Sequence, residues 1–160
     1  MGLPFAAGQR ILASDLNLAT QQAAWTSYTP TWTSSATQPA IANGTIVGYY
    51  AKVGRLVTAK ILVQTGSLST YGTGFYSFSL PFAAATTSIP NGAFAHSGAI
   101  SVQNNGGTFY AANAIILQSS PSVTNGILNA NGNFLGATVP VTFTGANTQF
   151  QCTVTYESTL

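Results

Sequence analysis

The side chains that could perform acid–base, nucleophilic or metal chemistry are few in this chain and far apart. Asp15 and Glu157 are the only carboxylate side chains, and they lie near opposite ends of the sequence. His96 is the only imidazole and Cys152 the only thiol. General acid–base catalysis needs paired titratable groups, and a metal site needs several converging ligands. We therefore predict a protein that is not an enzyme and that uses no metal or other cofactor.

The sequence motifs of common active sites are missing as well. No Gly-x-Ser-x-Gly turn presents a nucleophilic serine, and the glycine-rich segments 44–48 and 72–74 lack the Lys-Ser or Lys-Thr pair of a phosphate-binding loop. We expect their glycines to serve turns rather than phosphate binding. His96 is expected to be an ordinary strand residue. The alternative for His96 is a ring of three copies around a trimer axis, which would bind an ion or sense pH.

Aromatic side chains are stronger candidates for a function, because they stack on sugar rings or anchor interfaces. Most of the aromatic residues in this chain are expected to lie in the core. Tyr71 is the exception, because it occurs in the polar stretch 67–74, where no alternating pattern predicts burial. We predict Tyr71 to be a surface residue that contacts a glycan.

The scarcity of charge limits the classes of function. Four basic and two acidic residues make 4% of the 160 residues charged, against about 25% in an ordinary soluble domain. A surface this neutral is tolerated where sister subunits cover it or where it must adhere to a neutral partner. The few scattered bases predict no nucleic-acid binding, and no apolar stretch approaches the roughly 20 residues of a membrane span. The composition therefore favours an assembly component or a binding module.

An N-terminal arm is expected over residues 1–27. Ser14 is a good helix cap and Asp15 suits the positive end of a helix, which predicts a helix over Ser14–Trp25. Its apolar residues at helical spacing are Leu12, Leu16, Ala19 and Ala23. A helix of about ten to twelve residues is marginal alone, so we expect it to dock on another protein. The residues predicted to make this attachment are Phe5, Leu12 and Leu16.

After Pro30 the hydrophobic pattern has a period of two residues, which is typical of strands. The alternation is clearest in Arg55–Gln64 and Gln149–Tyr156. Further predicted strands are 44–50, 75–80, 93–103, 108–118, 127–128, 134–135 and 139–144. Asn-Gly pairs begin at Asn43, Asn91, Asn105, Asn125 and Asn131, and each of them predicts a tight turn. Residues 28–160 are therefore predicted to form one all-β domain, an antiparallel β-sandwich or jelly roll.

Three parts of the sequence together resemble a known class of proteins. They are Pro4–Asn17, then Trp25–Thr33 with Gly44–Arg55, and finally Thr153–Glu157. These segments are similar to parts of small bacteriophage virion structural proteins, of the minor tail, tail-tip fibre or head-decoration type, particularly in phages of actinobacteria. The resemblance covers most of the chain, and its motifs are turns, a Trp corner and a hairpin.

The resemblance implies a β-sandwich, commonly trimeric, that is tethered by its N-terminal segment and exposed on the virion exterior after assembly in the host cytoplasm. It carries over no catalytic residues. The chain lacks the coiled-coil or repetitive shaft of long fibres. We expect a tail-tip or minor tail component that contacts a host-surface glycan. The alternative is a trimeric head-decoration protein that binds the major capsid protein and stabilises the lattice. A carbohydrate-active enzyme would need residues from different subunits.

Overall fold

The computed structural model describes residues 24–85, 94–117, 119–128 and 133–159, with only the backbone described at 94–97, 127 and 128. Within these ranges the chain forms nine strands and no helix, so the all-β prediction is confirmed. The strands are β1 (Thr26–Tyr28), β2 (Trp32–Ser34), β3 (Thr45–Val53), β4 (Leu56–Gln64), β5 (Tyr76–Ser79), β6 (Phe94–Gln103), β7 (Phe109–Leu117), β8 (Val123–Leu128) and β9 (Gln149–Glu157).

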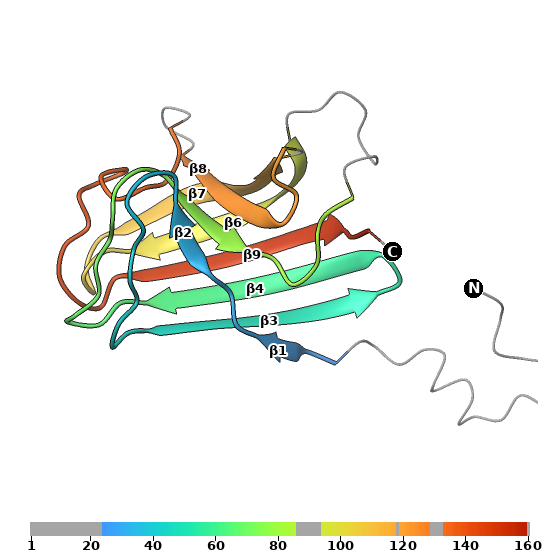
Figure 1. Ribbon diagram of the computed structural model, residues 1–160, viewed down its shortest axis with the longest axis horizontal. Helices are drawn as coiled ribbons and strands as arrows, with labels where there is room; N and C mark the ends of the chain where they lie inside the picture. Colours follow the sequence, from blue (N-terminus) through green and yellow to red (C-terminus); the bar gives the residue numbers. More distant parts are fainter. Residues whose placement is uncertain (1–23, 86–93, 118, 129–132, 160) are drawn as a thin grey trace, which may run out of the picture.

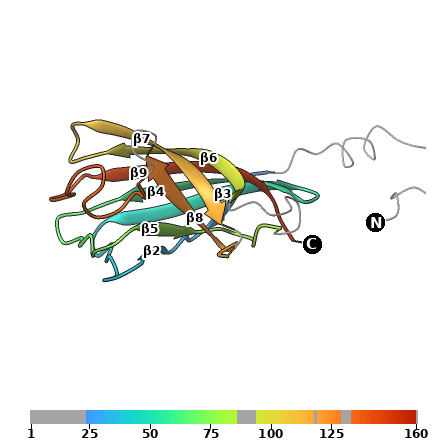
Figure 2. The ribbon, with the colours of Figure 1, turned by 90° about the horizontal axis from the view of Figure 1, so that it is seen from above.

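All nine strands join one antiparallel sheet in the order β1-β3-β4-β9-β6-β7-β8-β5-β2. The sheet curls into a half-barrel, so that β2 and β5 lie across the core from β6 and β9 (Figures 1 and 2). Its two edges come close because β1 and β2 are separated by only the segment 29–31. The Tyr28 hydroxyl on one edge donates a hydrogen bond of 3.3 Å to the Ser79 carbonyl oxygen near the other edge.

The period-two pattern fills the core. The inward residues of β4 and β9 are Val57, Ala59, Ile61, Val63, Phe150, Cys152, Val154 and Tyr156, all at most 3% exposed. Phe150 is central, since its ring centroid lies 5.6 Å from those of Trp32 and Tyr76 and 5.3 Å from that of Phe143. Burying each such side chain stabilises the fold by about 1.5–3 kcal/mol. The aromatic cluster therefore holds β2 and β5 over β9.

Turn chemistry explains one hairpin well. Asn105 and Gly106 both have positive φ, at 46° and 71°, as a type I′ turn requires. The Asn104 amide donates a 2.9 Å bond to the Thr108 carbonyl oxygen and closes the loop between β6 and β7. The predicted hairpin at this Asn-Gly pair is thus confirmed.

Other local predictions need correction. Asn125-Gly126 is not a turn but lies inside β8, because the buried Asn125 side chain donates hydrogen bonds of 2.8 Å to the Tyr76 carbonyl oxygen and 2.6 Å to Ser77 Oγ. Residues 139–144 form no strand, with only an isolated bridge between Val139 and Gly136, and of residues 134–135 only Phe134 makes an isolated bridge. The predicted helix Ser14–Trp25 lies almost wholly outside the described residues, and Ala24 and Trp25 are not helical.

Candidate functional site

The sequence-predicted site residues are not gathered in one place by the described structure. Phe5, Leu12 and Leu16 lie outside the described residues. Tyr71 is half-buried rather than free on the surface. Its hydroxyl donates a 2.7 Å hydrogen bond to the Gly145 carbonyl oxygen, and its ring stacks on Phe143 at 5.9 Å and 27°. Tyr71 therefore has a structural role, and its glycan contact stays a prediction.

The outward side of five neighbouring strands offers a better candidate. We call the outward residues of β3, β4, β9, β6 and β7 the outer face. The register of these strands places on it Val47, Tyr49, Ala51, Val53, Leu56, Thr58, Lys60, Leu62, Gln149, Gln151, Thr153, Thr155, Glu157, Ala99, Ser101, Gln103, Phe109, Ala111 and Asn113. Amides and hydroxyls dominate the middle strands β9 and β6, whereas the large apolar side chains lie on the flanking strands. The outer face is therefore neutral and polar at its centre.

Two hollows indent the outer face. The first, about 300 Å³, lies over β3, β4 and β9 and is lined by Tyr49, Leu62 and Gln151 among others. The second is about 60 Å³ and is lined by Ser101, Gln103, Phe109, Gln149 and Gln151. Because Gln151 lines both hollows, they adjoin each other. Together they make a shallow track that runs across the strands.

Each of the three basic side chains in the described residues is engaged by a neighbour. The Lys60 Nζ lies 4.5 Å from the centroid of the Trp25 ring, and the Lys52 Nζ lies 4.2 Å from that of Phe82. Such cation–π contacts are worth about 0.5–1 kcal/mol at exposed sites. Arg55 pairs with Glu157. A cation–π contact leaves the charge in place, so among its described residues the outer face carries one ammonium, Lys60 beside the first hollow, and one ion pair, Arg55–Glu157.

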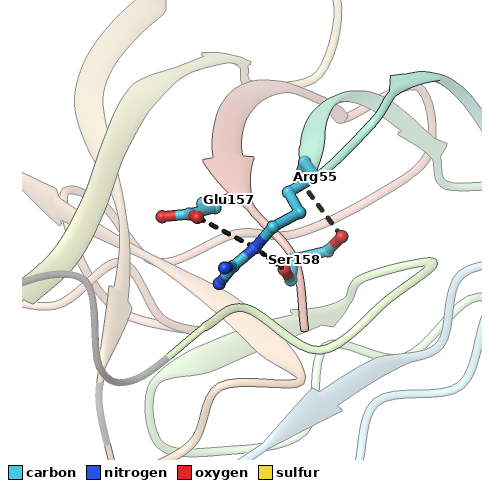
Figure 3. A network of polar contacts seen from close by, with 3 residues as sticks. All are labelled: Arg55, Glu157 and Ser158. Atoms are coloured by element: carbon cyan, nitrogen blue, oxygen red, sulfur yellow. Dashed lines mark hydrogen bonds and ion pairs between the residues drawn. The ribbon is translucent and has the colours of Figure 1, made fainter. Parts of the chain in front are cut away.

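The Arg55–Glu157 ion pair lies at one end of the outer face, beside the turn between β3 and β4 (Figure 3). The Arg55 Nε lies 2.9 Å from the Glu157 Oε1 and donates a 3.3 Å hydrogen bond to the Ser158 carbonyl oxygen. The Ser158 amide in turn donates a 2.7 Å bond to the Arg55 carbonyl oxygen. These contacts fasten the end of β9 to the turn.

The buried titratable groups are not poised for chemistry. Burial raises the pKa of the Cys152 thiol to about 12, although a hydrogen bond with Thr124 opposes the shift. Since the thiolate is the nucleophile, Cys152 is inert at neutral pH. Within the described residues, no group of three or more His, Cys, Asp or Glu side chains could hold a metal ion.

The described part of the chain contains no helix with the length and hydropathy to cross a membrane.

Comparison with known proteins supplies no relative from which a site could be transferred. A scan against protein-family models matches none of them, and searches of curated proteins and of solved structures find no match.

Sequence reasoning missed the outer face as a unit. The alternation in Gln149–Tyr156 does show Gln and Thr side chains on one side of the strand, with no charge among them before Glu157. What it does not show is that β9 lies between β4 and β6, which brings Tyr49 and Phe109 to the two sides of this polar strip. Nothing in the local sequence marks Phe109 as an exposed binding residue, because it follows directly after a turn.

Proposed function

We propose that this protein is a non-enzymatic structural component of a bacteriophage virion. It forms a homotrimer on the virion exterior as a tail-tip or minor tail protein. Residues 1–27 attach it to other tail proteins through Phe5, Leu12 and Leu16, and the curled sheet forms a jelly-roll-like body that contacts a host-surface glycan. The resemblance of its sequence to such proteins and the chemistry of its outer face support this role.

The neutral outer face is the observation that carries the proposal. A broad surface with amides and hydroxyls at its centre, and with Lys60 as the one charge outside an ion pair among its described residues, adheres mainly through hydrogen bonds and ring stacking. Lateral growth of the sheet is a poor alternative, because both of its edges are strands of only three residues, β1 and β2. The contact with the glycan is therefore expected through the outer face rather than through a sheet edge.

A head-decoration protein is the second candidate, and a specific surface feature favours it. Trp25, Val53 and Leu56 are 48%, 65% and 56% exposed. They lie at one end of the sheet, since β1 pairs antiparallel with β3 and Val53 pairs with Leu56 beside the turn (Figure 1). An apolar patch at the end where residues 1–23 join the domain suits contact with a capsid lattice.

The location of the protein on intact phage particles tests both candidates. Immunogold labelling or cryo-EM of purified particles should place it at the tail tip, where the proposed host contact occurs. A regular array over the head would instead establish the decoration role. If purified particles contain no copy of the protein, the virion proposal is wrong in both forms.

A further inference from the structure

We infer that the outer face binds a neutral oligosaccharide or polysaccharide, which lies across the strands from Tyr49 on β3 to Phe109 on β7. This inference deepens the proposed function and rests on it for the place where such a glycan is met, namely the host surface. The binding itself follows from the chemistry of the face and is testable with the isolated protein.

The first argument is the hydrogen-bonding chemistry at the centre of the track. Gln149 and Gln151 on β9 and Gln103 on β6 each carry an amide that both donates and accepts, and Ser101 adds a hydroxyl with the same capacity. Sugar hydroxyls also donate and accept. Because Gln151 lines both hollows, it can bond to a chain that passes from one hollow to the other.

The second argument is the position of the rings. Tyr49 is 48% and Phe109 is 70% exposed, and each lines one of the two hollows. Exposed aromatic faces pack against the apolar C–H faces of sugar rings. The register separates the two residues by four strand steps, about 19 Å, and by four residues along the strands, about 13 Å, which makes a diagonal of about 23 Å at ordinary strand spacings. The track is therefore long enough for a chain of several sugars.

The third argument excludes other occupants. A protein–protein interface has an apolar core and a polar rim, whereas this face has a polar centre and apolar flanks. A second copy of the chain is thus a poor fit. An anionic polymer would need several cations along the track, but Lys60 is the one basic side chain among the described residues that lines a hollow, and Arg55 is paired with Glu157. A neutral polymer of hydroxyl-bearing rings matches what remains.

Affinity electrophoresis of the full chain tests the inference. The native gels contain dextran, mannan, galactan or arabinan as neutral probes, and polygalacturonate or heparin as anionic probes. We expect at least one neutral polymer to retard the protein, with retardation unchanged between low and high salt, because no ion pair contributes. No retardation by any neutral polymer would overturn the inference. Retardation by the anionic probes alone, lost in high salt, would overturn it as well.

Substitutions on the track locate the site. Tyr49→Ala and Phe109→Ala should each lower the affinity measured from the retardation about tenfold, or about 1.4 kcal/mol, which is the size of effect expected from one lost ring contact. Leu68→Ala is the matched control, because Leu68 is also 70% exposed but lies off the outer face, between β4 and β5. Circular dichroism checks that each variant is folded. Equal weakening in the control would overturn the assignment.

Sedimentation velocity separates glycan binding from self-association through the same face. We expect wild type and the Tyr49→Ala/Phe109→Ala double variant to sediment as the same species. A smaller species for the double variant would show that the face joins copies of the chain, and would refute glycan binding there. Failure of all glycan tests would remove the proposed glycan contact but not the proposed place on the virion, because localisation on particles is measured independently.

Discussion

The two faces of β4 and β9 differ although their residues alternate one by one along the chain. On the inner face, Val57, Val63 and Val154 are fully buried, and no charged side chain points inward from either strand. On the outer face, Lys60, Gln151 and Thr153 are exposed to solvent around a hollow. The inner face stabilises the domain by burying apolar side chains, and the outer face presents polar side chains to solvent. Adjacent residues can therefore be changed to affect one property without the other.

The largest effect should come from Phe150→Ala on the inner face. Phe150 is 1% exposed and contacts the rings of Trp32, Tyr76 and Phe143. Deleting its ring should lower the free energy of unfolding by about 3–5 kcal/mol, because it leaves a cavity among packed aromatics. Denaturant unfolding measures the loss. The matched substitution Phe109→Ala on the outer face should change stability by less than about 0.5 kcal/mol. Similar losses for the two variants would contradict the division between the faces.

Gly98→Ala should affect the stability supplied by the inner face and the glycan binding of the outer face together. A Cβ at Gly98 would lie 2.1 Å from the Thr153 carbonyl oxygen and 2.8 Å from the Val154 Cα, so β6 and β9 would have to move apart. We expect a loss of about 1–3 kcal/mol in the free energy of unfolding, as for other overpacked sites. The second hollow spans these two strands, so glycan retardation should weaken as well. A variant with normal stability would show that β6 and β9 can separate freely.

These two positions also show how far sequence reasoning reaches. Phe150 belongs to a clear alternation, and the predicted strand Gln149–Tyr156 agrees with β9 within one residue. Gly98 has no local signal, because its importance comes from the close approach of β9, which is distant in the chain. The surface position predicted for Tyr71 differs from its half-buried one for the same reason, because its partners Phe143 and Gly145 are more than 70 residues away in the chain. Local patterns predicted strands and one hairpin, whereas strand order and the outer face required the tertiary pairing.

Alkaline pH should lower the stability that the inner face supplies. Burial raises the pKa of the Tyr156 hydroxyl to about 12, although its hydrogen bond to the Phe82 carbonyl oxygen opposes the shift, and burial raises the pKa of Cys152 to about 12. Both values exceed those of the unfolded chain. The folded state is therefore favoured fully below the unfolded pKa values, and this stability is lost as the pH rises toward about 12.

Tyr156→Phe tests this pH dependence. At neutral pH it should cost about 1 kcal/mol in the free energy of unfolding, because the hydrogen bond to the Phe82 carbonyl oxygen is lost. Between about pH 10 and 12 its stability should fall less steeply than that of wild type, since one ionising group is gone. Urea unfolding over a pH series measures both effects. An identical alkaline decline in the two proteins would mean that Tyr156 does not contribute.

The smallest effect should come from Glu157→Gln at the end of the outer face. The side chains of Arg55 and Glu157 are 42% and 36% exposed, so solvent screens their attraction, and such pairs contribute about 0–1 kcal/mol. We expect a loss within that range at low salt and almost none in high salt. Arg55 would still be held by the Ser158 carbonyl oxygen, and the pairing of Glu157 with Leu56 places the ion pair away from both hollows. Glycan retardation should therefore stay unchanged. A loss above about 2 kcal/mol that persists in salt would mean that the end of β9 depends on this charge, and that the outer face also contributes to stability.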